Sequence, residues 1–258
     1  MMEVRGLTCG YGGRPVVRRM EFRVEPGEVL GIVGPNGSGK STLIRAMAGL
    51  LRPMAGGVTV EGRDVGAMGA VERARLMAVV GQGISFDLPF SCLETVVMGR
   101  YAHSPGLRGY SRGDWELARA ALRRVGMEEK ARRPAHRLSG GEMQLLALAR
   151  ALCQDTPFLL LDEPTSHLDL ARRVEVFDLL VSLARQGRGV VCVIHDINLA
   201  SLYCHRLLMI KGGEMAALGP PDALVTPEVM EEVFGARVAV APHPLLGRPQ
   251  IHLLPAEG

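Results

Sequence analysis

The chain has 258 residues, with 30 basic and 27 acidic side chains and a formal net charge of +3. This length suits one domain or a core with a subdomain, and 47% hydrophobic with 22% charged residues is typical of a folded globular protein. The near balance of charge disfavours a dedicated nucleic-acid-binding protein. No apolar run approaches the roughly 18 residues of a membrane-spanning helix, and Glu3 and Arg5 make the N-terminus unlike a signal peptide.

The cysteines are odd in number and widely spaced, and no two of them form a Cys-x-x-Cys pair. They are Cys9, Cys92, Cys153, Cys192 and Cys204. This pattern favours buried thiols in a reducing cytosol over a disulfide framework or a zinc site.

The first third of the chain alternates short β-rich runs with glycine or proline turns. The predicted strands span residues 4–9, 16–24 and 29–33. The turns between them, residues 10–13 and Pro26-Gly27, are so short that they favour antiparallel pairing of consecutive strands. A glycine-rich loop at 34–39 then leads into a helix predicted at 41–50.

Residues 57–81 show a second strand–helix–strand pattern, and the chain then becomes mostly helical from about residue 85 to residue 154. The helices predicted there lie at 93–99 and 113–125, and a long one opens at Ser139. Strand character returns at 158–161 and 190–194 as continuous apolar runs, which are typical of central parallel strands covered on both faces. A helix at 170–185 between them completes a β–α–β unit.

The C-terminal part is predicted to add two hairpins and two short helices. The hairpins pair 207–210 with 214–218 and 238–241 with 250–254, and the helices lie around Asp222 and Glu228. The sequence therefore predicts an α/β fold with an antiparallel β lobe and an inserted α-helical subdomain. We expect a single domain over 1–258, in which 1–84 and 155–258 form the core with its β lobe and 85–154 form the helical subdomain.

Residues 34–42 (Gly-Pro-Asn-Gly-Ser-Gly-Lys-Ser-Thr) fit the pattern G-x-x-x-x-G-K-[ST] between a predicted strand and a predicted helix. Roughly 0.003 accidental matches are expected for this composition, so a mere glycine turn is a poor alternative. Glycines so placed let consecutive backbone N–H groups converge on one anion at a helix N-terminus. The pattern predicts a site for the phosphates of a nucleoside triphosphate.

The residues expected to bind nucleotide in this loop are Gly34, Asn36, Gly37, Ser38, Gly39, Lys40, Ser41 and Thr42. The Lys40 ammonium would bind the β- and γ-phosphates, the Ser41 hydroxyl suits Mg²⁺, and Thr42 would donate near the α-phosphate. Only Lys40, Lys130 and Lys211 among the 30 basic residues are lysines. A compact ammonium fits a tight backbone cradle better than an arginine fork does, whereas Lys130 and Lys211 indicate only ordinary surface charges.

Two adjacent acids, Asp162 and Glu163, end the buried strand predicted at 158–161. Ligands of open α/β sheets bind at this carboxyl edge. Asp162 is therefore expected to hold Mg²⁺ through water, and Glu163 to polarise the attacking water as a general base. Neighbouring strand residues point in opposite directions, but a turn beginning at Pro164 would let both face the phosphates. The alternative is a pair of solvated acids.

The segment Leu138-Ser139-Gly140-Gly141-Glu142 resembles the signature motif of ATP-binding cassette (ABC) ATPases, and it lies between the phosphate loop and the acidic strand as that family requires. A plainer interpretation is a helix cap, with Ser139 and Glu142 forming a capping box. The two interpretations are compatible, because a capped helix N-terminus can also bind a γ-phosphate. The resemblance implies a P-loop NTPase core of ABC ATPase type that hydrolyses ATP as a head-to-tail homodimer, with Ser139, Gly140 and Gly141 completing the partner's ATP site.

The resemblance also assigns Gln82 to the junction of core and helical subdomain, where it senses Mg²⁺ and the attacking water. Its neighbours Gly81 and Gly83 depart from the family's more usual proline, which implies a looser hinge. Asp169 closes the loop that communicates across the dimer, and His167 in that loop replaces a frequent alanine.

Two more family elements match single residues of this chain. His195, directly after the strand predicted at 190–194, corresponds to the histidine that contacts the γ-phosphate and orients the water. Tyr11 corresponds to the aromatic residue that stacks on adenine, although any β-turn can carry a tyrosine. Met143 stands where the family often has arginine or glutamine, and nothing is inferred from it.

Three functional classes compete for such a cassette: a transporter subunit, a soluble ABC protein acting on nucleic acid, and a regulatory ATP-binding protein. The second usually has two cassettes or a long coiled coil, and neither is found here. The third is disfavoured because Lys40, Asp162, Glu163 and His195 are all present. The resemblance therefore implies a peripheral ATPase at the cytoplasmic face of a membrane, bound to two integral permease subunits and served indirectly by a substrate-binding protein, with no nucleic-acid partner.

The segment 88–101, which ends in Met98-Gly99-Arg100-Tyr101, and the tail at 219–235 are similar to importers of iron chelates, haem and cobalamin. In a plainer interpretation Leu93, Val96 and Val97 simply pack the subdomain. Importers of molybdate, zinc or manganese, and exporters, remain open as alternatives.

Overall fold

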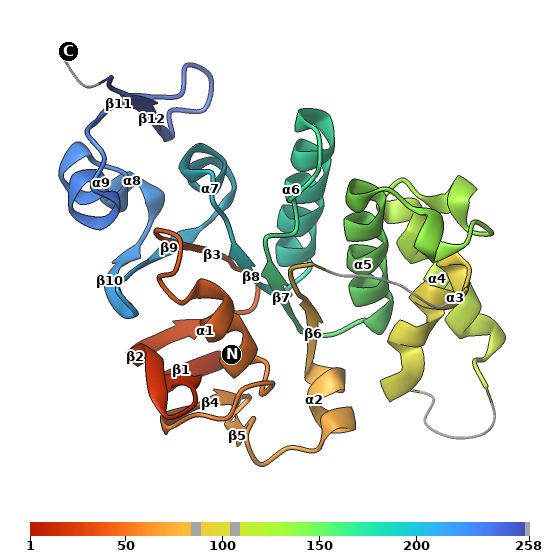
Figure 1. Ribbon diagram of the computed structural model, residues 1–258. Helices are drawn as coiled ribbons and strands as arrows, with labels where there is room; N and C mark the ends of the chain where they lie inside the picture. Colours follow the sequence, from red (N-terminus) through yellow and green to blue (C-terminus); the bar gives the residue numbers. More distant parts are fainter. Residues whose placement is uncertain (84–88, 104–108, 256–258) are drawn as a thin grey trace.

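The computed structural model describes residues 1–83, 89–103 and 109–255 (Figure 1). Three features of the sequence analysis therefore lie outside the described residues: the expected subdomain boundary at 84/85, Leu88, and most of the glycine-containing stretch after Tyr101.

A four-stranded antiparallel sheet has the order β2-β1-β4-β5. Its strands are β1 (Met2–Tyr11), β2 (Arg14–Val24), β4 (Ala55–Val60) and β5 (Arg63–Asp64). Along β1 and β2, buried side chains such as Val4, Leu7 and Met20 alternate with more exposed ones, the pattern of strands that cover a core with one face. The predicted antiparallel lobe is confirmed.

A six-stranded sheet has the order β10-β9-β3-β8-β7-β6 (Figure 1). Its strands are β3 (Val29–Val33), β6 (Met77–Val80), β7 (Phe158–Asp162), β8 (Gly189–Val193), β9 (Arg206–Lys211) and β10 (Glu214–Gly219). All but β10 pair in parallel. Every residue of β3, β7 and β8 is buried, as their continuous apolar runs predict.

The expected antiparallel pairing of β2 with β3 is wrong. The Pro26-Gly27 connection takes the chain from one sheet to the other, and β3 pairs in parallel with β8 and β9. The reason is that β3 is apolar on both faces and needs cover on both, whereas β2 can serve only one buried face.

Helices cover the parallel sheet, and α6 and α7 connect strands within it. They are α1 (Lys40–Met47), α2 (Ala70–Leu76), α6 (Leu170–Arg185), α7 (Ile197–Tyr203), α8 (Pro221–Leu224) and α9 (Pro227–Phe234). Helix α6 links the parallel neighbours β7 and β8, so the predicted β–α–β unit is confirmed. A final hairpin pairs β11 (Val238–Pro242) with β12 (Pro249–Leu253).

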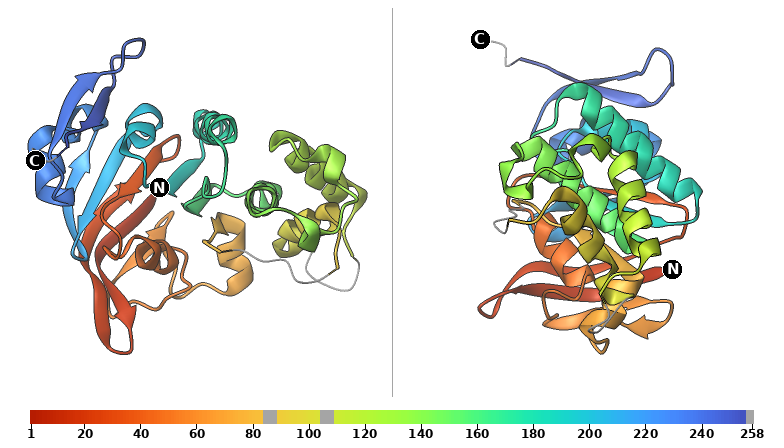
Figure 2. Two further views of the ribbon diagram at one scale, coloured as in Figure 1. Left: turned by 45° about the horizontal axis from the view of Figure 1, so that its top comes forward. Right: turned by 90° about the vertical axis from the view of Figure 1, so that its right-hand side faces the viewer.

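Helices between β6 and β7 form a group on the side of the molecule away from the antiparallel sheet (Figure 2, left). They are α3 (Cys92–Val97), η1 (Met98–Ala102), α4 (Arg112–Arg124), η2 (Glu128–Lys130), η3 (Ala135–Arg137) and α5 (Gly140–Gln154). Capping boxes begin α3, α4 and α5, which explains why these helices start where they do. The Gln154 amide fastens α5 to the core by donating to Ala74 O at 2.6 Å and Met77 O at 3.0 Å.

Alternate residues of the central strands serve two hydrophobic cores. Leu159 and Leu161 of β7 pack with the helical side, while Phe158 and Leu160 pack with α1 and the antiparallel sheet. The five cysteines are buried free thiols in these layers, as their spacing predicts. None of the helices in the described ranges combines the length and apolarity needed to cross a bilayer.

Candidate functional site

The phosphate loop connects β3 to α1, and two of its glycines have no room for a side chain. Gly34 has φ +154°, and a Cβ there would lie 2.1 Å from the carbonyl oxygen of Ile210. Gly39 has φ +99°, and a Cβ would lie 2.6 Å from Val17 Cγ1. The loop can therefore take this shape only with glycine at both positions.

Lys40 begins α1 and is only 6% exposed. Its Nζ donates to the carbonyl oxygens of Gly34 at 2.8 Å and Pro35 at 2.9 Å, so the ammonium lies inside the loop. Burial lowers the pKa of Lys40, and the nearby Glu163 and Asp162 carboxylates act in the opposite direction. An ammonium with so little water around it interacts strongly with an anion.

Ser41 and Asp162 place two oxygen atoms side by side at the carboxyl edge of the sheet. Ser41 Oγ donates to Asp162 Oδ1 at 3.1 Å. Asp162 ends β7 and is 2% exposed, so burial raises the pKa of its carboxyl group, against the lowering effect of the Ser41 hydrogen bond. A hydroxyl and a carboxylate are the hard oxygen groups that Mg²⁺ prefers.

Glu163 turns away from the strand because its own backbone is left-handed, with φ +55°. The turn that the sequence placed at Pro164 thus begins one residue earlier. Glu163 Oε1 lies 2.5 Å from His195 Nε2, across from the end of the neighbouring strand β8. Gln144 of α5 donates to the Glu163 carbonyl oxygen at 3.3 Å and so ties this turn to the helical group.

A cavity of about 720 Å³ brings most of the predicted residues together. Its lining comprises Tyr11, Val16, Asn36, Gly37, Gly39, Lys40, Ser41, Thr42, Gln82, Glu163 and His195. All except Val16 were predicted as site residues. Tyr11 is 47% exposed at the rim, and its hydroxyl accepts a hydrogen bond from Arg45 Nη1 at 3.1 Å. Of the predicted phosphate-loop residues and acids, Gly34, Ser38 and Asp162 do not line this cavity.

The signature segment lies elsewhere, at the start of α5. Ser139 is the N-cap: its N–H donates to Glu142 Oε2 at 2.8 Å, and its Oγ accepts from the Glu142 N–H at 3.3 Å, which confirms the capping box. Within the described part of the chain, neither Ser139 nor Gly140 nor Gly141 contributes to the phosphate cavity. The two halves of the predicted site are therefore not joined in one chain.

The loop at 166–169 packs directly on the signature glycines. A Cβ on Gly141 would lie 2.7 Å from the His167 carbonyl oxygen, and His167 itself has φ +63°. Asp169 caps α6 by accepting from the Arg172 N–H at 2.9 Å and likewise does not line the cavity. His167 therefore shapes the surface beside the signature segment through its backbone.

Lys130 lies at the surface as expected, with its side chain 40% exposed, and it also forms an ion pair beside the signature segment. Its Nζ donates to Glu142 Oε1 at 2.5 Å, and Arg133 lies 3.7 Å from the same oxygen. The Lys130 hydrogen bond, with that of the Ser139 N–H, lowers the pKa of Glu142 to about 2. The scarcity of lysine was the one sequence signal that could have indicated the Lys130–Glu142 pair. No pattern in the sequence distinguished Arg45, which bonds to Tyr11, or Gln144, which bonds to Glu163. Lys211 Nζ donates to the Glu232 carbonyl oxygen.

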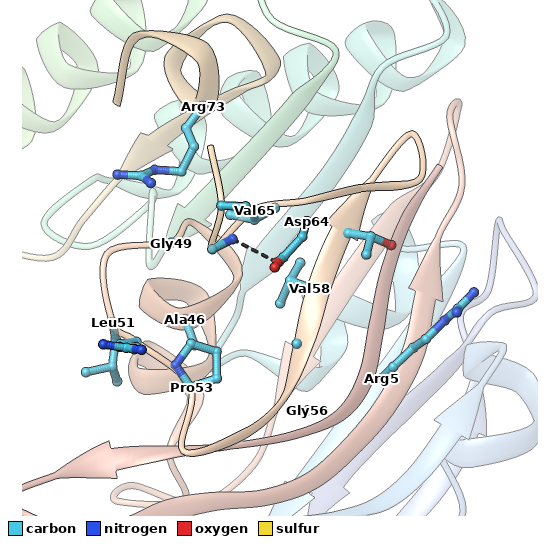
Figure 3. Close-up of a pocket in the computed structure, with 15 residues that line it drawn as sticks. Arg5, Ala46, Gly49, Leu51, Pro53, Gly56, Val58, Asp64, Val65 and Arg73 are labelled. Carbon is cyan, nitrogen blue, oxygen red and sulfur yellow. Dashed lines mark hydrogen bonds between the residues drawn. The ribbon is translucent and has the colours of Figure 1, made fainter. Parts of the chain in front are cut away.

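A larger cavity, of about 950 Å³, lies between the end of α1 and the strands β4 and β5 (Figure 3). Arg5 and Arg73 lie at its opposite ends and do not converge (Figure 3). Arg5 pairs with Glu3, and Arg73 donates to the Met68 carbonyl oxygen. Asp64 accepts from the Gly66 N–H within its own turn at 2.9 Å. Although this cavity is larger than the phosphate cavity, its charged groups do not converge, so we do not take it as the functional site.

Comparisons with known proteins agree with the geometry. The family model for ABC transporters matches residues 17–166. The chain is 40% identical to the hemin import ATP-binding protein HmuV of Gloeobacter violaceus, over 97% of this chain and 93% of that protein. It is 38% identical to the cobalamin import ATP-binding protein BtuD of Halobacterium salinarum, over 98% of this chain and 64% of that protein.

Two solved structures share the fold. An inward-facing structure of a protein described as a metal-chelate type ABC transporter has a TM-score of 0.85 at 28% identity, covering 99% of this chain and 98% of its own. The cassette MJ0796, solved as a dimer in a post-hydrolysis state with ADP and Pi, has a TM-score of 0.78 at 27% identity, covering 85% and 98%. With a family model over more than half of its length and relatives over nearly all of it, the chain belongs to the ABC transporter family, as an ATP-hydrolysing cassette of α/β fold.

Proposed function

We propose that this cassette hydrolyses ATP in the 720 Å³ cavity, with Lys40, Gln82, Glu163 and His195 as its catalytic residues, and thereby powers a metal-chelate or corrinoid importer. The observation that carries the proposal is the 2.5 Å contact of Glu163 with His195 in the cavity of the phosphate loop. A carboxylate held by an imidazole beside phosphate-binding groups is suited to orient and deprotonate a water.

The loop residues supply the phosphate-binding groups. Backbone N–H groups around Gly37 and Gly39 and the Lys40 ammonium would bind the phosphates, with Asn36, Gly34 and Thr42 shaping the same nest. Ser38 Oγ is buried and has no hydrogen-bond partner among the described residues. Ser38 does not line the cavity, so we assign it to the phosphates from its place in the loop pattern. Tyr11 lines the same cavity, and we assign it to stacking on the adenine.

The residues present also fit a Mg²⁺ ion. Ser41 Oγ and Asp162 Oδ1 are 3.1 Å apart, and Gln82 lines the cavity that Ser41 enters. We assign Ser41, Gln82 and Asp162 to holding the ion, Asp162 through a water. When bound, Mg²⁺ neutralises charge on the phosphates.

Glu163 acts as the general base: it accepts a proton from the attacking water as the new P–O bond forms and ADP leaves. His195 keeps the Glu163 carboxylate oriented and contacts the γ-phosphate, and Lys40 stabilises the negative charge on the transferred group. These roles all belong to one chain.

The signature residues act in trans. Ser139, Gly140 and Gly141 are assigned to the γ-phosphate of a second copy, because they cap α5 outside the phosphate cavity of their own chain. A head-to-tail twofold dimer makes the two shared sites equivalent, and the dimeric MJ0796 cassette supports this arrangement. Asp169 lies on the same loop as His167, which packs on Gly141, and so belongs to this dimer face.

Closure of the dimer would move residues 85–154 as a unit against the core formed by 1–84 and 155–258. We assign the cassette to the cytoplasmic face of a membrane, where it would bind two permease subunits that receive their solute from a binding protein. The hemin and cobalamin import relatives support a metal chelate or corrinoid as that solute. No nucleic-acid partner is proposed, since the formal net charge is only +3.

Replacing the base tests the assignment directly. Glu163→Gln keeps the size of the side chain but cannot accept the proton, so ATP turnover should fall by about 10² to 10⁴ while ATP still binds. Single-turnover hydrolysis and equilibrium ATP binding, measured on the same preparation, separate the two effects. Turnover at the parent rate would show that Glu163 is not the base.

A further inference from the structure

The helix that follows His195 is held by the C-terminal hairpin, a part of the chain to which the proposed function gives no task. His195 directly precedes Asp196, the N-cap of α7, whose Oδ1 accepts from the Leu199 N–H at 3.1 Å. The position of the His195 backbone is thus set by the first turn of α7. That helix has only seven residues, so contacts from outside it determine how it lies.

Asn198, three residues after His195, bonds to both backbone groups of Ile251 in β12. Its Oδ1 accepts from the Ile251 N–H at 2.7 Å, and its Nδ2 donates to the Ile251 carbonyl oxygen at 3.2 Å. The amide therefore pairs with the free edge of β12 as a neighbouring strand would. One turn further along, Ser201 Oγ donates to the Pro249 carbonyl oxygen at 2.6 Å, and Ser201 is fully buried.

The hairpin itself is a fixed support. Val238 is 5% exposed in the main hydrophobic core, and Val240 and Ile251 pack against the same core. Arg248, which precedes β12, pairs with Asp222 of α8 at 2.8 Å. In Figure 1 the hairpin lies above α7, with β12 facing the helix. Hydrogen bonds from α7 to this hairpin therefore anchor α7 to the core.

We propose that Asn198 is a positioning residue for ATP hydrolysis, because its two hydrogen bonds to Ile251 fix the first turn of α7 and thereby hold His195 against Glu163. This assignment depends on the role proposed above for His195. The hairpin β11–β12 then serves the catalytic site although none of its residues is among the described residues that line the phosphate cavity. A loosened α7 would leave the phosphate loop intact but let the His195–Glu163 contact open, and small misplacements of catalytic groups are costly in rate.

The test compares Asn198→Leu, which keeps the approximate size of the side chain but removes both hydrogen bonds, with the parent chain. We expect kcat for ATP to fall about 3- to 10-fold, with KM for ATP and the equilibrium binding of ATP unchanged within twofold. Asn198→Asp keeps the acceptor for the Ile251 N–H, so its kcat should lie between those of the parent and of Asn198→Leu. Ser201→Ala should lower kcat less than Asn198→Leu, and Ser182→Ala, at a half-buried serine of α6, is its matched control and should change nothing.

The same Asn198→Leu substitution is then placed in a His195→Ala background and measured by single turnover with excess enzyme. Because Asn198 acts through His195, its effect should shrink below twofold there. An unchanged kcat for Asn198→Leu, a parallel loss of kcat, ATP binding and thermal stability, or an equal loss in both backgrounds would overturn the inference. A His195→Ala chain with parent turnover would instead refute the proposed role of His195.

Discussion

The phosphate cavity and the signature segment differ in which groups a single chain supplies to them. In the cavity, Lys40 is buried and Glu163 contacts His195, and Ser41 bonds to the buried Asp162 just beside it, so groups from the ends of β7 and β8 and from the phosphate loop already lie close together. At the signature segment, Ser139 and Glu142 bond to each other at a helix end, and none of the described residues that line the phosphate cavity belongs to this segment. In the function we propose, the first region carries out the chemistry, and the second acts only when a second chain binds to it.

This difference predicts that substitutions in the cavity abolish chemistry within a chain, whereas those at the signature segment abolish assembly. Lys40→Ala should have the largest effect, a loss of about 10² or more in ATP turnover, because a desolvated ammonium at the phosphates is removed. ATP binding should weaken as well. Lys211→Ala, at an exposed lysine whose Nζ donates to the Glu232 carbonyl oxygen, is the matched control. Steady-state ATPase assays of both variants test this prediction. Equal rates for the two would contradict the assignment of Lys40 to the phosphates.

Asp162→Asn should have a smaller and more specific effect. It keeps a group that can bond to Ser41 but removes the charge assigned to Mg²⁺, so the Mg²⁺ concentration for half-maximal activity should rise about 10-fold or more. Titration of Mg²⁺ at saturating ATP measures this shift. A lower maximal rate with an unchanged Mg²⁺ midpoint would contradict the assignment of Asp162 to the ion.

Lys130→Met should have the smallest effect and should act on stability. The hydrogen bond from Lys130 holds the pKa of Glu142 at about 2, below its ordinary value of 4.5. The contribution of the pair is therefore fully present above pH 4.5 and is lost as the pH falls from 4.5 toward 2. We expect a loss of about 1 kcal/mol in the free energy of unfolding at pH 7, shrinking below pH 4.5.

Denaturant unfolding of the Lys130→Met chain at several pH values checks this pattern. Arg112→Met is the control, because Arg112 and Glu116 form a more exposed pair on α4 and should contribute less. The same destabilisation at pH 7 and at pH 3 would contradict the role given to the Lys130–Glu142 pair.

Local patterns predicted the parts of this molecule that short segments determine by themselves. The bounds expected for the helix at Leu170–Arg185 agree with α6, and the phosphate loop takes the strand–loop–helix context its pattern requires. The pairing of β3 was predicted wrongly because short connections say nothing about which sheet a strand enters. Lys130–Glu142 and Asn198–Ile251 join residues 12 and 53 positions apart, and only the folded chain brings such partners together.

If the signature segment completes the ATP site of another chain, as we propose, ATP should bring two chains together. Sedimentation of Glu163→Gln with MgATP should show a dimer that is absent without ATP. Ser139→Asp added to that chain keeps an N-cap residue but places a negative charge at the γ-phosphate, and Ser111→Asp at the capping box of α4 is its control. We expect Ser139→Asp to remain a monomer with ATP bound, while Ser111→Asp dimerises. A Glu163→Gln chain that binds ATP and stays monomeric, or a Ser139→Asp chain that dimerises equally well, would contradict it.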